Sequence, residues 1–360
     1  MRARVIGEEE KASFNNFISN HAKGHILQTW EWGELKERSL WQPLRLIVED
    51  QGTIYAAISL LKRQLPAGMG CLFYAPRGPV LDINDSLAWD TLWQGCRDLA
   101  AEHKAVFCKI DPDVADDDKV WNQRIKAAGF VAADKGEGFE GVQPRYVFRL
   151  DISPDEETLM ANFHQKTRYN LRLAERKEVT VTAAAPQSEL PVFYQLLQET
   201  AQRDNFLIRP FSYYKDFYDL LIPQGLAEMF LVYYQGKAIA GSLAFILGNK
   251  AWYIYGASAN QYRNVMPNYL MQWRMIQWAK QHGCTMYDFR GVPGDVAEDH
   301  PLYGLVKFKK GFGGNYIRFI GEYDLVYKPF VYKMYNDLEP LYQKGVRKLI
   351  HAKKRLLNRG

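Results

Sequence analysis

The chain has 360 residues, of which 47% are hydrophobic and 14% aromatic, and a formal net charge of +5. This length and composition are enough for two hydrophobic cores, and ordinary domain sizes favour two domains. The sequence contains no run of about 18 apolar residues, which excludes a membrane-spanning helix. The charged stretch Met1 to Lys11 is unlike a signal peptide. The four cysteines are scattered without a Cys-x-x-Cys pair, so we expect a cytoplasmic protein without a zinc ribbon or a disulfide framework.

The first half of the chain predicts a β-hairpin followed by a strand, a helix and a closing strand. A Gln51-Gly52 turn joins the two strands of the hairpin. The elements that follow are a strand over Cys71–Tyr74, a helix over Ser86–His103 and a strand over Val106–Ile110.

The second half of the chain repeats this order of elements. A Gln235-Gly236 turn again joins two strands. After it come an aromatic strand over Trp252–Gly256, a helix over Asn268–His282 and a strand over Met286–Phe289. The repetition predicts two tandem copies of one mixed α/β domain.

We expect the first domain in residues 1–150, the second in residues 151–328, and a basic helical tail over residues 329–360. The order strand, helix, strand resembles the core of the GNAT acyltransferases, in which the turn before the helix is rich in glycine because backbone amides approach a pyrophosphate. Here that turn, residues 262–267, has no glycine, and Pro267 has no backbone N–H to donate. The sequence therefore predicts a mixed α/β fold of two GNAT-like domains without the coenzyme A loop, and an acyl donor other than coenzyme A.

Several motifs in a fixed order carry a resemblance to a known family. They are Gln28-x-Trp30-x-Trp32-Gly33-x-x-Lys36, Lys166-Thr167-Arg168-Tyr169-Asn170, Ala240-Gly241-Ser242-Leu243, Trp252-Tyr253-Ile254-Tyr255-Gly256, Asn268-Tyr269-Leu270-Met271-Gln272-Trp273, Tyr287-Asp288-Phe289-Arg290-Gly291 and Phe308-Lys309-Lys310-Gly311-Phe312-Gly313. Together they are similar to the Fem family of aminoacyl-tRNA-dependent peptidyltransferases, over nearly the whole chain. Members with a coiled-coil arm carry a long charged insertion in the second domain. Because Phe206 and Glu228 are too close in sequence to hold one, the chain resembles the arm-less type.

The resemblance implies transfer of Ala, Gly or Ser from aminoacyl-tRNA to the side-chain amine of a peptidoglycan stem peptide, on a UDP-linked or lipid-linked muramyl pentapeptide. Since an aminoacyl-tRNA is already an activated ester, this reaction requires no metal and no cofactor. The enzyme has to align the amine with the ester and stabilise the oxyanion. The alternatives are an N-acyltransferase with another activated donor that acts on an exported polymer, and a non-catalytic scaffold that binds tRNA or precursors.

The position that the resemblance indicates for oxyanion stabilisation is Lys309, preceded by the apolar Phe308. Its neighbour Lys310 is the rival for this role. The alternative is that Lys307, Lys309 and Lys310 form a solvated basic face or bind RNA phosphates.

Four residues are implied as contacts of the acceptor. Lys36, Arg209 and Tyr213 match residues that hold the diphosphate and the muropeptide, and Tyr255 matches a tyrosine that lines the peptide channel. Tyr253 has the same character as Tyr255 and is expected to face the other side of the sheet, so the sequence leaves open which of the two points into the cleft.

Two carboxylates at strand ends are placed to take the proton of the attacking amine. Asp111 ends the strand Val106–Ile110, and Asp288 lies in its counterpart. The stronger alternative for both is that they cap the turn that follows. Substrate phosphate or solvent can accept the proton instead.

Two basic segments bear on partners. Residues 164–177 carry several cations, among them Arg168 and Arg172, which we expect to contact tRNA together with Lys310. The tail after Leu341 carries seven Lys and Arg and no acidic residue, among apolar residues. We expect it to contact the inner face of an anionic membrane, with RNA binding and packing on the second domain as the alternatives. This tail favours the lipid-linked acceptor.

Overall fold

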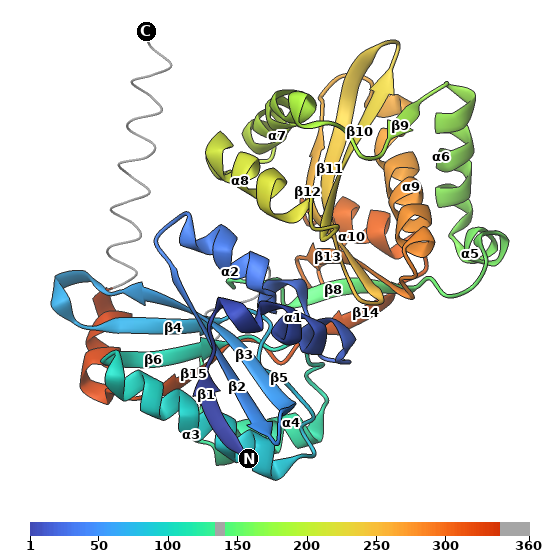
Figure 1. Cartoon of the computed structure of the whole chain (residues 1–360). Helices are drawn as coiled ribbons and strands as arrows, with labels where there is room; N and C mark the ends of the chain where they lie inside the picture. The colour runs from blue at the N-terminus through green and yellow to red at the C-terminus, as the bar shows by residue number, and fades with distance from the viewer. Residues whose placement is uncertain (134–140, 339–360) are drawn as a thin grey trace, which may run out of the picture.

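The computed structural model describes residues 1–133 and 141–338, in which two mixed β-sheets are flanked by helices (Figure 1). The first sheet has the strand order β1-β2-β3-β4-β6-β15-β7, and β5 pairs with β3. Its strands are β1 (Arg2–Val5), β2 (Gln42–Asp50), β3 (Thr53–Gln64), β4 (Cys71–Ala75), β5 (Val80–Leu81), β6 (Ala105–Ile110), β7 (Val131–Ala132) and β15 (Tyr323–Val326). The helices in this half of the chain are α1 (Lys11–Asn20), α2 (Trp30–Glu37), α3 (Ser86–Glu102) and α4 (Lys119–Ala127).

The second sheet has the strand order β14-β8-β13-β12-β11-β10-β9. Its strands are β8 (Tyr146–Asp151), β9 (Thr180–Thr182), β10 (Ala227–Tyr234), β11 (Lys237–Leu247), β12 (Lys250–Ser258), β13 (Met286–Val292) and β14 (Asn315–Arg318). The helices of this half are α5 (Glu156–Asn162), α6 (Gln165–Arg176), α7 (Leu190–Arg203), α8 (Phe211–Leu221), α9 (Pro267–Gln281) and α10 (Tyr303–Lys310). Short 3₁₀ helices are η1 (Glu8–Glu10), η2 (Ile26–Gln28), η3 (Pro66–Gly68), η4 (Gln187–Glu189) and η5 (Arg263–Val265).

The predicted internal repeat is present in both sheets. The β2–β3 and β10–β11 hairpins turn at Gln51-Gly52 and Gln235-Gly236, and all four residues have positive φ, as type I′ hairpin turns require. Both hairpins shift register at equivalent places, after Val48 and Val232. In each half a parallel pair follows, β4 with β6 around α3 and β12 with β13 around α9. The expected mixed α/β fold of two GNAT-like halves is therefore confirmed.

Two strands belong to a different sheet from the one that the expected division at residue 150 implies. Strand β8 already pairs with β13 and β14 of the second sheet. Strand β15 returns to the first sheet, where it pairs with β6 and β7. It covers what would otherwise be the open edge of β6, and its Leu325 joins the core of the first half. Pairing over such a sequence separation leaves no local signal in the chain.

One hydrophobic core is shared by the two halves. Helices α1 and α2 lie between the sheets (Figure 1) and contribute Phe14, Trp30 and Trp32. From the second half, Phe217 and Trp252 join the same cluster. The ring of Trp32 meets Phe245 edge-on, with 5.9 Å between centroids. Since burial of large aromatic side chains supplies much of the stability of a core, this shared cluster fixes the two halves against each other.

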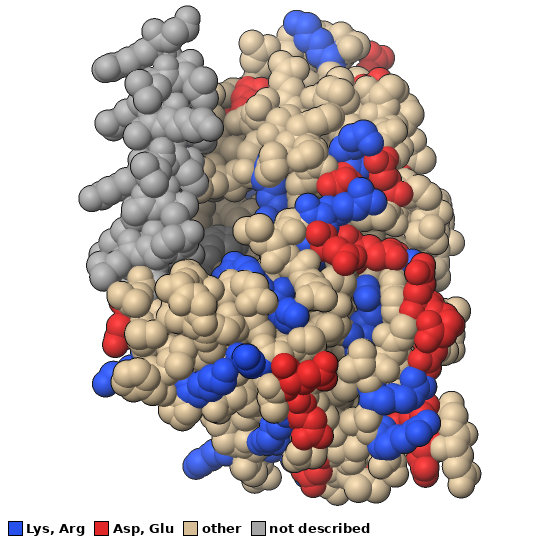
Figure 2. Space-filling model, turned by 60° about the vertical axis from the view of Figure 1, so that its left-hand side comes forward, with Lys and Arg blue, Asp and Glu red and all other residues tan. Residues whose placement is uncertain are grey.

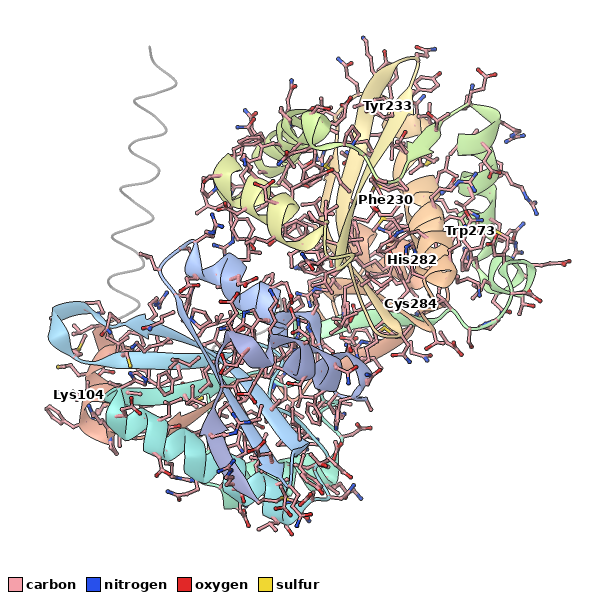
Figure 3. All side chains as sticks on the ribbon, in the orientation of Figure 1. Lys104, Phe230, Tyr233, Trp273, His282 and Cys284 are labelled. Atoms are coloured by element: carbon pink, nitrogen blue, oxygen red, sulfur yellow. The ribbon has the colours of Figure 1, made fainter. Side chains whose placement is uncertain are left out.

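The two faces of the second sheet carry different helices. Helices α7 and α8 cover the face toward the first half, and α6 and α9 cover the opposite face (Figure 1). Figure 3 labels Phe230 of β10 and Trp273 of α9, which are both buried. Phe230 packs against Trp278 of α9, and Trp273 packs against Phe163, which follows α5. The site described below lies where these layers meet α2 and α10.

Residues 329–338 are helical, and their inner face packs on the first half. Phe107 contacts the ring of Tyr332 at 5.2 Å and that of Tyr335 at 5.6 Å between centroids. The basic part of the tail, residues 339–360, lies outside the described residues. Within the described part of the chain, the search for helices long and apolar enough to cross a bilayer finds none. All four cysteines are buried free thiols.

Candidate active site

Four residues predicted to contact the acceptor come together between the two halves. The Lys36 Nζ of α2 donates to the Tyr213 hydroxyl of α8 at 3.0 Å, across 177 residues of sequence. That hydroxyl lies 3.1 Å from the hydroxyl of Tyr255 on β12. The Arg209 guanidinium lies over the Tyr213 ring, 4.9 Å from its centroid. The structure thus places two cations and two phenols in one cluster, which we call the cationic site.

Local structure explains how Lys36 is held. The Thr29 side chain caps the start of α2 by accepting from the backbone N–H of Trp32. One turn later, Lys36 lies on the face of the helix that carries Trp32, and its ammonium is 4.1 Å from the centroid of that ring. The Lys36 side chain is 8% exposed, and no acidic group among the described residues is paired with it.

The electrostatics of the cationic site favour an incoming anion. Burial, and next the charge of Arg209, lower the pKa of Lys36 to about 7. Burial also raises the pKa of Tyr213 well above its usual value, so this phenol stays neutral and can donate a hydrogen bond. A diphosphate would supply the negative charge that the two cations lack.

Lys309 and Phe308 lie at the end of α10. Lys309 is 4% exposed and donates to two backbone carbonyls of β13, to Arg290 at 3.2 Å and to Gly291 at 2.7 Å. Burial lowers the pKa of Lys309 to about 7, with opposing effects of Asp288 and Arg290. Phe308 packs edge-on against Tyr269, with 4.9 Å between ring centroids. Lys309 is therefore a buried lysine held by carbonyls, with no carboxylate bound to it within residues 1–133 and 141–338, which is an unusual environment for an ammonium.

The strands next to Lys309 diverge. Parallel pairing of β12 with β13 ends at Trp252 and Asp288, after which β12 continues beside β11 and β13 beside β8. The carbonyls that accept from Lys309 belong to the diverging part of β13. The Lys309 ammonium also lies 5.8 Å from the centroid of the Tyr253 ring on β12.

A β-bulge settles how the two tyrosines of β12 are oriented. The register of β11 with β12 shifts between Tyr253 and Tyr255, so that Tyr255 joins the core shared by the two halves and Tyr253 joins the core around α9. The two therefore lie on opposite faces, as expected, but they do so because of the bulge, since a regular strand would place residues two apart on the same face. Gly256 makes room for Tyr253, because a β-carbon there would overlap the tyrosine hydroxyl.

On the Tyr253 side a cavity of about 860 Å³ opens at the start of α9. Tyr253, Phe308 and Tyr269 line it together with Arg263 and Asn268. The turn before α9, which lacks glycine, forms one wall of this cavity. Its Tyr262 and Met266 adopt left-handed backbone conformations, and Pro267 is the first residue of the helix.

Asp111 lies within a hydrogen-bond network of the first half. Its carboxylate accepts from the Tyr74 hydroxyl at 2.7 Å and from the Arg77 backbone N–H at 2.6 Å. Burial raises the pKa of Asp111 to about 6, against the lowering effect of Arg77. Among the described residues no hydrogen bond or ion pair joins Asp111 directly to Lys309 or to the cationic site. These contacts account for Asp111 as an anchor of Arg77 and Tyr74.

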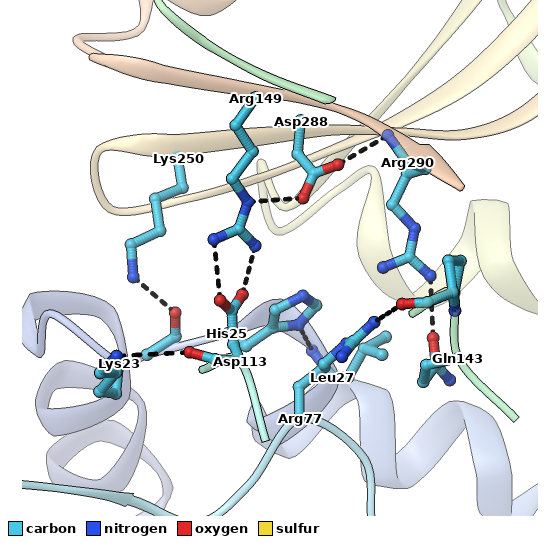
Figure 4. A network of polar contacts seen from close by, with 12 residues as sticks. Lys23, His25, Leu27, Arg77, Asp113, Gln143, Arg149, Lys250, Asp288 and Arg290 are labelled. Atoms are coloured by element: carbon cyan, nitrogen blue, oxygen red, sulfur yellow. Dashed lines mark hydrogen bonds and ion pairs between the residues drawn. The ribbon is translucent and has the colours of Figure 1, made fainter. Parts of the chain in front are cut away.

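Asp288 makes the turn-capping contact that was the stronger alternative from the sequence, and it also forms an ion pair. Its carboxylate accepts from the backbone N–H of Arg290, two residues later, which is a capping contact. It also pairs with the Nε of Arg149 at 2.9 Å. The same arginine reaches Asp113 of the first half with both terminal nitrogens, at 2.8 and 2.5 Å (Figure 4). The bridge Asp113–Arg149–Asp288 thus connects the two halves, and its Asp288 also acts electrostatically on Lys309.

The residues expected to bind tRNA lie where α6 meets the end of α10. The backbone N–H of His164 donates to the carbonyl of Gly311 at 2.8 Å. Arg172 and Lys310 are exposed. Arg168 is half-buried, and its guanidinium donates to the carbonyls of Ala161 and Phe163 at the end of α5. Arg172 and Lys310 are thus available to a partner, whereas Arg168 also stabilises the local fold.

Sequence reasoning did not find the bridge Asp113–Arg149–Asp288, and it gave Arg290 no role. Nothing in the spacing of Asp113 and Arg149 indicates that they meet, because Asp113 lies in the loop after β6 of the first half and Arg149 lies in β8 of the second sheet. Arg290 stood inside a recognised motif, but its backbone conformation is visible only in the structure.

The fold and these sites define the class of protein, a tandem GNAT-like acyltransferase. A tandem GNAT protein from the clavulanic acid biosynthesis pathway matches 90% of the chain with a TM-score of 0.53 at 12% identity, over 98% of that protein, which shows the fold alone. The model of the FemAB family matches residues 10–235 and 224–339. The chain therefore belongs to the FemAB family and is an aminoacyltransferase.

Individual relatives agree with this assignment. The lipid II:glycine glycyltransferase of Staphylococcus saprophyticus is 31% identical over 92% of this chain and 95% of that protein. The protein of the same name from Staphylococcus aureus is 29% identical over 94% of this chain and 97% of that protein. The crystal structure of FemX superposes with a TM-score of 0.86 at 28% identity, over 93% of this chain and 99% of FemX. As expected for the arm-less type, α8 is the only helix between Phe206 and Glu228.

Proposed function

We propose that this enzyme transfers an amino acid from aminoacyl-tRNA to the side-chain amine of the stem peptide of a lipid-linked peptidoglycan precursor. The observation that carries the proposal is the buried Lys309, which lies where β12 and β13 diverge and has no carboxylate bound to it. The cationic site lies on one face of β12, at Tyr255, and the cavity lies on the other, at Tyr253. The gap between the diverging strands would let the two substrates meet at Lys309.

The cationic site would hold the diphosphate of the acceptor through Lys36 and Arg209, with Tyr213 donating a hydrogen bond. The cavity would hold the aminoacylated 3′ end of the tRNA. Its aromatic lining, with Tyr269 and Phe308, suits a stacked base, and the exposed Arg263 suits a backbone phosphate. Arg172 and Lys310 would contact the tRNA further along, with Arg168 beside them.

In the reaction the amine nitrogen attacks the ester carbonyl carbon, a C–N bond forms, and the ribose oxygen leaves with the bonding electrons. The Lys309 ammonium, close to its pKa at neutral pH, would stabilise the oxyanion formed on the carbonyl oxygen. Phe308 would shield this site from water. The amine proton would pass to solvent or to a substrate phosphate. Asp111, with its raised pKa, is the proposed protein group for this proton, which would reach it through the Tyr74 hydroxyl.

Among the candidate amino acids Gly, Ala and Ser, glycine has the support of the relatives, which are named lipid II:glycine glycyltransferases. The same names support the lipid-linked acceptor over the UDP-linked form. We place the enzyme in the cytoplasm, at the inner face of the membrane.

Exposed apolar side chains support the membrane contact. Leu40, four residues after Lys36, and Phe330 on the helix 329–338 are each 82% exposed. Met334 and Leu338 continue the same helix face at 37% and 50% exposure. Trp41, next to Leu40, and the inner face of this helix pack against the same apolar cluster of the first half. Figure 2 shows that Lys and Arg are interspersed with Asp and Glu on the visible face, so charge alone does not define a docking surface there.

The test is transfer of labelled Gly, Ala or Ser from charged tRNA to the lipid-linked precursor in vesicles and to the UDP-linked form. Lys309→Met is measured beside Lys307→Met, which removes an exposed lysine from the same helix. We expect transfer of glycine to the lipid-linked acceptor by the wild type and by Lys307→Met, and its loss in Lys309→Met. No transfer from any charged tRNA to either acceptor would refute the proposal.

A further inference from the structure

Arg290 has a backbone conformation that needs an explanation. It lies in β13 with φ +60, in the left-handed region, which a residue with a large side chain adopts rarely and at a cost. Its N–H donates to Asp288 at 2.6 Å, and its carbonyl accepts from Lys309 at 3.2 Å. This conformation aims the Arg290 side chain toward the first half, where Figure 4 shows it beside Gln143 and Arg77.

The Arg290 guanidinium has no carboxylate partner among the described residues. Its one recorded hydrogen bond goes from Nη2 to the neutral Oε1 of Gln143 at 2.8 Å. The nearby Asp288 is committed to the backbone of Arg290 and to the Nε of Arg149. Arginine has five N–H donors in a planar fork, so most of the donor capacity of Arg290 is left for another partner.

The surroundings of Arg290 carry an excess of positive charge. Burial, and next the charge of Arg77, lower the pKa of Arg290 to about 10. Lys309 adds a third cation, which also interacts with Arg290. The Arg77 guanidinium donates to the carbonyls of Asp111 and Pro144 and has no carboxylate bound to it either. The carboxylate of Asp288 compensates part of this charge, since it raises the pKa of both Arg290 and Lys309. Buried cations in excess of their counter-charges are unfavourable, and a bound anion would compensate the rest.

The position of Arg290 relates it to the acceptor. It interacts electrostatically with Tyr255, a member of the cationic site, and also with Lys309. Its direct contact is with Lys309, which donates to the Arg290 carbonyl. An acceptor peptide that reaches from the cationic site to Lys309 would therefore run close to Arg290.

We propose that Arg290 binds a carboxylate of the acceptor peptide and thereby sets which amine of that peptide reaches Lys309. This inference rests on the proposed function. The planar fork of arginine matches a carboxylate with two parallel hydrogen bonds. A stem peptide offers two carboxylates, one at its C-terminus and one on an internal acidic residue. Both present the same chemistry to Arg290.

The test uses three acceptors that differ only in these groups: both carboxylates free, the C-terminal one amidated, or the internal one amidated. The full-length enzyme is measured as wild type, Arg290→Gln and Arg290→Gly. Glycine suits the left-handed backbone, so Arg290→Gly keeps the local conformation while removing the side chain. Thermal unfolding of this variant is expected at or above the wild-type temperature.

We expect amidation of one carboxylate to lower kcat/KM of the wild type about tenfold to a hundredfold, the range of a lost charge-assisted hydrogen bond. The amidated acceptor with the lowered kcat/KM identifies the carboxylate that Arg290 binds. Arg290→Gln and Arg290→Gly should each have the same kcat/KM for all three acceptors. Lys36→Met, as a control, should lower kcat/KM for all three and keep the preference.

The inference is overturned if the wild type does not distinguish the three acceptors, or if Arg290→Gly keeps the wild-type preference. If no acceptor is turned over by the wild type, the proposed function fails by itself. The dissociation constants of the three acceptors, measured by titration calorimetry for wild type and Arg290→Gly, then decide the role of Arg290 independently.

Discussion

Replacing Lys309 by Met should abolish the reaction and at the same time stabilise the fold. Met has a similar length and no charge, so it fills the same space. Lys309 is 4% exposed, and its ammonium is bound by two backbone carbonyls and no carboxylate. A residue with a merely structural role would not be kept in such an environment, because the buried charge destabilises the folded state.

The magnitude follows from the pKa of Lys309, which burial lowers from 10.5 to about 7. One pKa unit corresponds to about 1.4 kcal/mol, so at pH 7 the burial of this ammonium costs about 4 kcal/mol. Its two hydrogen bonds return about 1 kcal/mol each. Lys309→Met should thus raise the free energy of unfolding at pH 7 by about 2 kcal/mol.

The sign of this difference in the free energy of unfolding depends on pH. Between pH 7 and 10.5 the unfolded chain binds the Lys309 proton and the folded protein does not, so wild-type stability gains from rising pH in this window. Lys309→Met lacks this gain, so its advantage should vanish at about pH 9, where the cost of burying the ammonium equals the value of the two lost hydrogen bonds, and reverse above that pH. Urea unfolding of both proteins at several pH values measures the difference in the free energy of unfolding. The kcat of Lys309→Met should fall about 100- to 1000-fold. The reasoning is refuted if Lys309→Met is less stable than wild type at pH 7, or if it transfers as fast as Lys307→Met.

Three further predictions concern binding, membrane contact and the bridge. Lys36→Met should raise KM for the acceptor about tenfold to a hundredfold with little change in kcat, and wild-type affinity should fall as pH rises above about 7, where free Lys36 loses its proton; an unchanged KM would contradict the diphosphate role. The double variant Leu40→Asp/Phe330→Asp should lose binding to anionic vesicles and transfer to the lipid-linked acceptor, yet keep transfer to the UDP-linked form. Leu87→Asp, at a 57% exposed position on α3, is the matched control, and equal losses there would argue against the membrane surface. Arg149→Lys should lower the free energy of unfolding by about 3 kcal/mol, because two buried carboxylates lose donors; urea unfolding within 1 kcal/mol of wild type would show that the bridge contributes little.

Local sequence signals were enough to predict the repeated elements. Gln-Gly turns can adopt the positive φ that tight hairpins need, and both occur in hairpins as predicted. The helix expected over Asn268–His282 is α9, Pro267–Gln281, since Pro favours the first position of a helix. The absence of glycine before α9 could also be seen in the sequence, because it depends on residue type alone.

The candidate site could be predicted only in part from the sequence. Motif resemblance indicated Lys36, Arg209, Tyr213 and Tyr255, which the structure brings together. It did not reveal which tyrosine of β12 faces the first half, because a bulge at this point reverses the simple alternation of a strand.

The sequence by itself determined the types of element, their repeated order, the family and the chemistry available at each position, since these depend on residue identity and short-range spacing. Only the tertiary structure decided the return of β15 to the first sheet, the bridge through Arg149 and the burial of Lys309. These features arise from contacts between residues far apart in the chain. The pKa of a lysine and the conformation of Arg290 depend on what surrounds them, and only folding creates those surroundings.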